Sequence, residues 1–479
     1  MNRRSSTALL LLCLPGPALA EHMSASGYSM SVHWAGMLSL TVFLLALLAV
    51  AVEEFIDLPK SKPMLLCAGI IWGLIGWHAQ QAGSSHAAEL ALRHNLLQYA
   101  ELMLFFLVVM TYINALSERR VFLALRSWVG HRQYSYLRIF WVTGIGTFLL
   151  SPFLDNLSTV LLMGAIILNL ERENRRFIAI ACTHIVIASN AGGAFSPFGD
   201  LTTLMVWQQD IISTTGRVDF FSFFNLFLPS VVSYLLPASV MHFFVPKGRL
   251  AVPQEQINMR RGSKRIMLLF LMTIATAVFF QWQLYLPAAI GIMTGLSYLQ
   301  FFGYFLKQTH QPSDTAITTT ESPDFSIVVE SRQPFDIFLR VARSEWDTLL
   351  FLCGVILSVG GLGYLGYLTL ASELLYVQWG ATTANVSIGL ASAVLENIPT
   401  MSMVLRMNPE MSLGQWLLVT LAAGTGGSLL SIGSAAGVAL MGHAKEKYTF
   451  FSHLRWTPVI ALGFAAGILC HLWLNSAYF

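Results

Sequence analysis

The sequence predicts an all-α polytopic membrane protein, built as an inverted repeat of about five plus five transmembrane helices. Hydrophobic residues make up 55% of the chain and charged residues only 11%, and many apolar runs approach the length needed to cross a bilayer. The stretch 153–159 (FLDNLST) returns as 394–400 (VLENIPT), and each copy is followed by a glycine-rich break, at 192–200 and 426–434. An acid beside an amide, repeated in apolar sequence and followed by a broken helix, is typical of secondary transporters made of two halves.

Composition also excludes several classes of protein. The net charge of +3 is too small to indicate a nucleic-acid partner, and the main partner of so apolar a chain is the lipid bilayer. The five cysteines are scattered and contain no Cys-x-x-Cys pair, which argues against a disulfide framework or a soft-metal site. The pattern requires no cofactor.

The first twenty residues resemble a signal peptide. Arg3 and Arg4 precede an apolar run over 8–14, and Ala18-Leu19-Ala20 fits a small-residue cleavage site. We therefore expect residues 1–20 to be a signal peptide, with an uncleaved anchor as the alternative. A multi-pass protein of the bacterial inner membrane with its N-terminus outside fits this pattern.

The remaining chain divides into two halves of similar plan. The first half covers 34–246, a cytoplasmic linker covers 247–265, and the second half covers 266–476. The polar stretch 307–347 is expected to be a mobile loop. The predicted spans are 34–55, 62–80, 95–116, 177–210, 226–246, 266–282, 285–306, 348–368, 413–442 and 457–476.

Two further apolar segments, 139–170 and 384–407, are predicted to be re-entrant hairpins. Arginines flank the first on both sides, at 119–138 and at 172–176. Because basic loops stay in the cytoplasm, this segment must enter the membrane and return, with its tip at 151–156. The same count places the second hairpin on the opposite face, and an odd number of crossings per half makes the halves inverted. The spans 177–210 and 413–442 are expected to be broken helices.

The hairpin tips carry the first candidate site residues. Asp155 lies next to Asn156, and Glu396 lies next to Asn397. A carboxylate in hydrocarbon is costly and usually functional, and carboxylate, amide and carbonyl oxygens form a hard-oxygen site suited to Na⁺ or Li⁺. The alternative is a pair of structural asparagine caps beside chance acids.

The breaks carry the second set of candidates. Asn190 precedes the first break, which ends in Asp200, Thr202 and Thr203, whereas the second break offers Ser431 and Ser434 but no acid. A carboxylate that binds either H⁺ or Na⁺ is sufficient for exchange, and Asp155 and Asp200 are the leading candidates. The alternative for Asp200 is a helix N-cap. The predicted Na⁺ ligands are Asp155, Asn156, Asp200 and Asn397.

Three accessory polar residues lie near span ends. His94 and Glu101 are seven residues apart and fall on one face of a helix; His94 could sense pH or relay protons, or be an ordinary interfacial histidine. Asp347 opens the span 348–368, where the alternative is a helix N-cap.

The chain resembles NhaD-type Na⁺/H⁺ antiporters of the ion-transporter superfamily, which also holds arsenite efflux pumps and Na⁺-coupled dicarboxylate carriers. The resemblance covers about 35–477 and is strongest over 96–116, 151–159, 189–203, 347–361 and 433–456. It implies a dimeric elevator-type transporter in which hairpins and broken helices form the moving domain. It also implies functional roles for a set of polar residues, with His94 and Asp347 as accessory sites: Asp155, Asn156, Asn190, Asp200, Thr202, Thr203, Asn397, Ser431 and Ser434. Glu396 stands where relatives commonly have Asp.

Three functions compete at this stage. The first is exchange of cytoplasmic Na⁺ and Li⁺ for external H⁺, which would serve Na⁺ and pH homeostasis. The second is a carrier for arsenite or a carboxylate, although acids at the tips disfavour an anion. An enzyme is not expected, because an intramembrane aspartyl protease would need Tyr-Asp and Gly-x-Gly-Asp, and here Pro197 replaces the first glycine and Tyr-Asp does not occur.

Overall fold

The computed structural model describes residues 33–56, 58–130, 134–171, 173–249, 258–309 and 345–479. It is helical apart from one two-stranded sheet, and eight helices are long and apolar enough to cross a membrane within these residues. The chain is therefore a multi-pass membrane protein, as the composition predicts. The expected signal peptide lies outside the described residues, as do 310–344 of the expected loop and 250–257 of the linker.

The first half contains three long helices, a helical pair, a broken helix and a last long helix. Its elements are α3 (Trp34–Ala51), α4 (Glu53–Ile56), α5 (Ser61–Gln81), α6 (Ser85–Glu118), α7 (Val121–Gly130), α8 (Tyr136–Leu150), α9 (Asn156–Leu170), α10 (Arg175–Gly193), α11 (Leu201–Gln208), β1 (Ile212–Ser213), β2 (Gly216–Arg217), η2 (Phe221–Leu226) and α12 (Phe227–His242).

The second half repeats this order of long helices, helical pair, broken helix and last helix. Its elements are α13 (Ser263–Gln283), α14 (Ala288–Gln308), α16 (Trp346–Tyr364), α17 (Tyr367–Ser372), η4 (Glu373–Gln378), α18 (Ala381–Leu395), α19 (Asn397–Met407), α20 (Leu413–Gly426), α21 (Ala435–Ala444), η5 (Lys445–Lys447), α22 (Phe450–Leu454), α23 (Thr457–Leu474) and η6 (Ser476–Tyr478).

Several predicted spans differ from the observed helices. The span 34–55 is divided into α3, which ends at Ala51, and α4, and the span 226–246 ends earlier, at His242. α6 is longer than 95–116 because its polar first turns continue the helix beyond the apolar stretch. The span 348–368 ends at Tyr364, because Gly366 adopts φ 90°, a left-handed conformation open mainly to glycine. The short helices α17 and η4, which follow this glycine, were not predicted.

The helical pair α8–α9 turns back on itself. Ser135 caps the start of α8 by accepting a hydrogen bond from the Arg138 amide, and the helix ends where Ser151 and Pro152 begin the turn. The Tyr136 hydroxyl at the start of α8 donates to Glu171 at the end of α9. The two open ends of the pair therefore lie together, and the tip lies a helix length away.

Both broken helices lose their regular backbone at paired glycines that touch a hairpin. A Cβ on Gly192 at the end of α10 would fall on the Phe148 carbonyl of α8. A Cβ on Gly426 at the end of α20 would fall on the Gly389 carbonyl of α18. Only glycine permits this backbone approach, so each hairpin arm packs directly on its broken helix.

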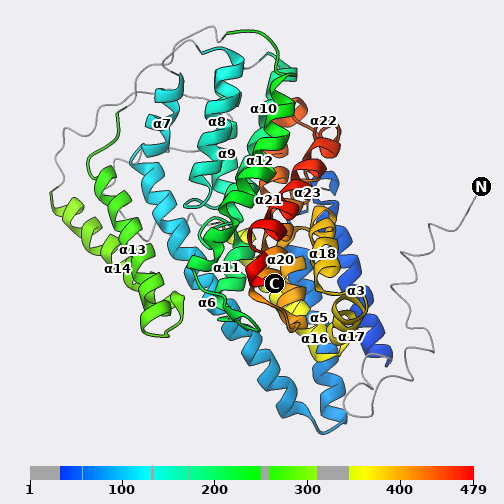
Figure 1. The fold of residues 1–479 in the computed structure, drawn as a ribbon. Helices are drawn as coiled ribbons and strands as arrows, with labels where there is room; N and C mark the ends of the chain where they lie inside the picture. The colour runs from blue at the N-terminus through cyan, green and yellow to red at the C-terminus, as the bar shows by residue number, and fades with distance from the viewer. Residues whose placement is uncertain (1–32, 57, 131–133, 172, 250–257, 310–344) are drawn as a thin grey trace, which may run out of the picture.

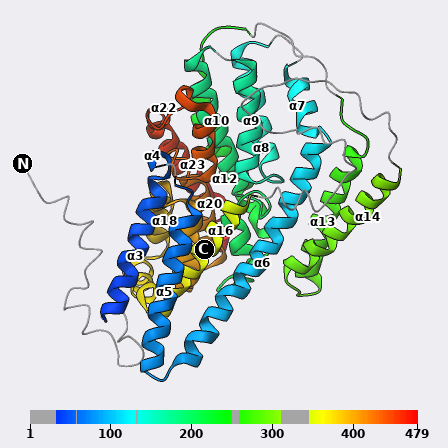
Figure 2. The same cartoon turned by 180° about the vertical axis from the view of Figure 1, so that it is seen from behind.

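The two halves enclose a shared centre. The last helices, α12 and α23, pack on each other, and α10 contacts α20. Figures 1 and 2 show α13 and α14 on one flank, beside α6, and α3 and α5 on the opposite flank, beside α16. The hairpins and broken helices lie between these flanks.

The basic loops gather at one end of the molecule. The Arg260 amide donates to the Arg119 carbonyl at 3.0 Å, and Arg175 pairs with Glu446 at 3.4 Å. The loop at Gly248 accepts a hydrogen bond from the Tyr136 amide. Figure 1 places this end at the top, where α7, α8, α10 and α22 begin or end. The positive-inside rule predicts that this end faces the cytoplasm.

Candidate functional site

The candidate site lies where the first hairpin tip, the first break and the second hairpin tip meet. Asp200 is at the centre of this meeting point and is 4% exposed. Its carboxylate interacts electrostatically with Asp155 and contacts the side chains of Asn156 and Asn397. The structure thus brings together the four residues predicted to be Na⁺ ligands.

Asp155 supports the first hairpin tip. Its Oδ1 accepts a hydrogen bond from the Ser158 amide at 2.8 Å, and its Oδ2 accepts one from the Ser158 hydroxyl at 3.2 Å. Asp155 therefore caps α9, which brings its negative charge to the positive end of the α9 dipole. The carboxylate is buried beside the broken helix rather than exposed to lipid.

Asn156 bridges the tip and the break. With its amide nitrogen turned toward the surrounding oxygens, it donates to the Gly199 carbonyl at 3.0 Å and the Ser189 carbonyl at 2.9 Å. The hydrogen-bond network favours this orientation. The amide oxygen then takes the position beside the Asp200 carboxylate.

Asp200 caps α11 with one oxygen only. Its Oδ1 accepts hydrogen bonds from the backbone amide of Thr202 at 3.1 Å and from the side-chain amide nitrogen of Asn397 at 3.3 Å. Its buried Oδ2 makes no hydrogen bond of good geometry among the described residues, although the Thr202 side chain lies close to the carboxylate. The helix-cap interpretation of Asp200 is therefore correct but incomplete. A buried carboxylate oxygen without a partner is costly, so it points to a ligand.

The second break faces Asn190 instead of an acid. The Asn190 amide donates to the hydroxyls of Ser428 at 2.9 Å and Ser434 at 3.1 Å. The Ser431 hydroxyl is buried and has no partner among the described residues. The Thr203 hydroxyl donates to the Ala194 carbonyl at 3.3 Å and stabilises the first break. Asn190 thus holds the two breaks together beside the carboxylates.

Glu396 does not share the centre with Asp200. Its Oε1 accepts a hydrogen bond from the Lys60 ammonium at 2.7 Å, and both side chains are buried. The carboxylate is therefore neutralised by the start of α5, and it does not offer a free ligand in this conformation. Sequence analysis placed Glu396 among the ion ligands because it occupies the position that matches Asp155.

Of the accessory residues, His94 and Glu101 lie on α6, whereas Asp347 of α16 interacts electrostatically with Lys60 and Glu345. His94 is exposed on α6 and lies 3.3 Å from Gln98, and Glu101 interacts electrostatically with His94. Asp347 does not cap α16, since Glu345 is the N-cap residue; instead it accepts a hydrogen bond from Ser61 of α5. The helix-cap alternative for Asp347 is therefore wrong.

Sequence reasoning missed two charged residues near the site. Lys60 was not singled out from the sequence, because no spacing links it to Glu396. Glu345 interacts electrostatically with Asp155 and Lys60. The available signal was the position of both residues next to the first turn of an apolar helix, where a charge can remain close to the membrane interior.

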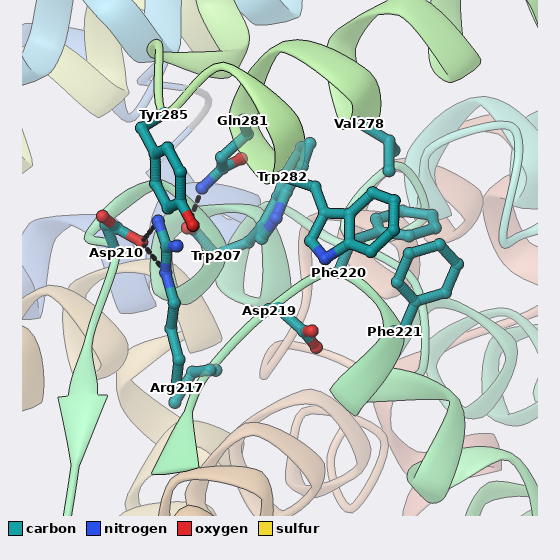
Figure 3. Close-up of a pocket in the computed structure, with 11 residues that line it drawn as sticks. Trp207, Asp210, Arg217, Asp219, Phe220, Phe221, Val278, Gln281, Trp282 and Tyr285 are labelled. Carbon is teal, nitrogen blue, oxygen red and sulfur yellow. Dashed lines mark hydrogen bonds and ion pairs between the residues drawn. The ribbon is translucent and has the colours of Figure 1, made fainter.

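A separate pocket lies between α11 and α13, and it contains none of the predicted site residues. Arg217 donates to Asp210 at 2.7 Å and stacks on Tyr285, while Gln281 of α13 donates to the Trp207 carbonyl at 2.9 Å (Figure 3). Asp210 is paired with Arg217, and Asp219 accepts hydrogen bonds from the Ser222 amide and hydroxyl, so both acids of this pocket have partners.

The fold and the site define a polytopic membrane transporter with a buried carboxylate centre. The citrate transporter family matches residues 30–424. The Na⁺/H⁺ antiporter NhaD of Vibrio cholerae is 52% identical over 98% of this chain and 99% of its own length. The protein of the same name from Alkalimonas amylolytica is 51% identical over 98% and 97%. Sodium/proton antiporter 1 of Arabidopsis thaliana is 32% identical over 89% and 70%. The chain belongs to the citrate transporter family and, within it, to the NhaD-type antiporters.

Proposed function

We propose that this chain exchanges cytoplasmic Na⁺ and Li⁺ for external H⁺ across the bacterial inner membrane. The observation that carries the proposal is the Asp200 carboxylate, which is buried among polar groups and keeps one oxygen without a partner among the described residues. The names of the most similar relatives support the same exchange.

The exchange rests on competition for the carboxylates. Na⁺ would bind between Asp155, Asp200 and the amide oxygens of Asn156 and Asn397, with Thr202 and the serines of the second break as further oxygen donors. A proton on either carboxylate removes a charge that Na⁺ needs, so the two ions exclude each other. Each time the site moves from one side of the membrane to the other it carries either Na⁺ or H⁺, so the gradients of the two ions become coupled.

Alternating access is proposed to follow an elevator motion of an inverted repeat. Corresponding contacts between hairpin and broken helix in the two halves support the duplication: Ser151 donates to the Ser189 carbonyl at 2.8 Å, and Ser392 donates to the Ala423 carbonyl at 3.0 Å. The hairpins and broken helices would move together against the helices of the two flanks. The resemblance to NhaD-type antiporters further supports the proposal of a homodimer, and the pattern of residues 1–20 supports the proposal of a signal peptide.

Everted membrane vesicles test the exchange directly. Vesicles from cells without their own Na⁺/H⁺ antiporters are acidified by respiration, and an internal pH dye reports proton release when salt is added. We expect NaCl and LiCl to raise the internal pH and KCl to have a smaller effect. No response to NaCl at any pH between 6.5 and 9.5 would overturn the proposal.

One observation favours a second candidate, because the family that matches 30–424 is described as a citrate transporter. A citrate carrier would have to hold a trianion next to Asp155 and Asp200, where like charges repel. Uptake of radiolabelled citrate into the same vesicles decides between the two. Citrate uptake without Na⁺-dependent proton release would contradict the antiport proposal and favour a citrate symporter.

A further inference from the structure

Lys60 is a buried cation directly before α5. It is 7% exposed, and its ammonium donates to Glu396 at the tip of the second hairpin, 2.7 Å away. Its ammonium also lies 4.7 Å from the centre of the Phe351 ring of α16. The pair therefore joins the flank formed by α5 and α16 to the hairpin α18–α19.

Acids surround this lysine on three sides. Besides Glu396, it interacts electrostatically with Glu53 of α4 and Asp347 of α16. Asp347 is fixed in turn by Ser61, the residue after Lys60. One ammonium thus compensates several carboxylates, and among the described residues it is the cation that forms an ion pair with Glu396.

Glu396 adopts an unusual backbone conformation. Its φ of 68° and ψ of 152° lie in a region that is occupied almost only by glycine. It forms no side-chain cap on α19, and its carbonyl accepts a hydrogen bond from the Thr400 hydroxyl at 2.6 Å. Strain of this kind persists only where the surroundings hold it, and the ion pair to Lys60 is the strongest such contact.

We propose that Lys60 is a positioning residue for ion exchange, whose pair with Glu396 latches the second hairpin tip to α5 in this conformation and parts during every transport cycle. This inference rests on the proposed function, because it assigns the latch to one of the two access states. Partly separating a buried ion pair is unfavourable, because each charge then needs water or a new partner. The latch is therefore closed or open, and the strain at Glu396 is released when it opens.

Cross-linking tests whether the tip must leave α5. Lys60→Cys and Glu396→Cys are combined in a chain whose own five cysteines are replaced, and a short bis-methanethiosulfonate joins the two thiols in vesicles. We expect at least a tenfold loss of Na⁺-triggered proton release on cross-linking and recovery after reduction. Full exchange by the cross-linked protein would overturn the latch, while the proposed function would stand. Absence of exchange in the unmodified chain would overturn the proposed function instead.

Charge variants provide a second test that does not depend on cysteines. Lys60→Met and Glu396→Gln each leave one buried charge without its partner, and each is expected to lower the exchange rate several-fold. The double variant removes both charges and should recover more than half of the rate lost by the slower single variant, with an unchanged Na⁺ half-saturation constant. The control is Lys62→Met, because Lys62 is exposed on the next turn. A double variant no faster than the slower single variant would overturn the latch.

Discussion

The two hairpin tips share a sequence motif but use their acids in different ways. Asp155 has a relaxed backbone, with φ −56° and ψ 160°, and caps its own helix through Ser158. Glu396 has a strained backbone, caps nothing, and reaches Lys60 on another element. The first tip thus keeps its acid beside the ion centre, whereas the second tip uses its acid as a contact to the flank.

The two breaks differ in a related way. Asn190 and Gly424 occupy matching positions, and so do Ser434 and Asp200, because the same number of residues separates each pair. Asn190 reaches across to Ser434 at 3.1 Å, and the free oxygen of Asp200 faces the space above Gly424. The same pair of positions therefore meets in both cases, but with different residues. Asn190 donates its side-chain amide to the Ser434 hydroxyl, whereas the Asp200 carboxylate lies over Gly424, which has no side chain. The two breaks thus share a backbone arrangement, but only the first carries a carboxylate.

Because the carboxylates of the ion centre lie in the first half only, removing either of them should reduce ion exchange more than any other change. Asp155→Asn and Asp200→Asn keep the shape of the side chain but remove the site that binds H⁺ or Na⁺. We expect exchange in everted vesicles to fall at least a hundredfold, with normal amounts of protein in the membrane. The matched control is Asp210→Asn, which removes an acid paired with Arg217 at the outer pocket (Figure 3). Near-normal exchange by both site variants would show that the ions bind elsewhere.

The next largest effect should be the pH dependence of the apparent Na⁺ affinity. When protonated carboxylates dominate, each proton that must leave for Na⁺ to bind weakens the apparent affinity about tenfold per pH unit as the pH falls. Exchange should accordingly be weak at acid pH and rise as the carboxylates lose their protons. Half-saturation constants for Na⁺ in vesicles at several pH values measure the slope. A constant that does not change with pH would require separate Na⁺ and H⁺ sites.

The scaffold, in contrast to the charge, should respond equally in both halves. Gly192→Ala and Gly426→Ala each place a methyl group on a carbonyl of the facing hairpin arm. Overpacking of this kind costs about 1–3 kcal/mol, so both variants should unfold at lower temperature in detergent. Gly442→Ala is the control, because nothing lies within 4 Å of its added Cβ. A loss of stability in only one half would show that the two interfaces are not equivalent.

The sequence predicts the scaffold well, because apolar runs, basic loops and paired glycines are local signals. It also predicts the residues that meet at Asp200, since the acid-amide motif is repeated. It could not predict the partner of Glu396, because Lys60 is distant along the chain and its burial depends on how α5 packs against α16. Symmetry itself misled the interpretation here: the motif matches Glu396 to Asp155, but the two side chains point to different elements.

The smallest expected difference concerns the two serines at matching positions of the hairpins. Ser151 donates to the Ser189 carbonyl and Ser392 to the Ala423 carbonyl, so Ser→Ala at either position should cost about 1 kcal/mol of stability. Only Ser151 also lies 2.8 Å from the Asn156 side chain. Its removal frees the amide that is proposed to present an oxygen to Na⁺, so Ser151→Ala should raise the Na⁺ half-saturation constant about threefold to tenfold, while Ser392→Ala should leave it unchanged. Thermal unfolding in detergent and Na⁺ titration of vesicles separate the two effects. Equal half-saturation constants in the two variants would mean that Asn156 acts only as a structural link between the tip and the break.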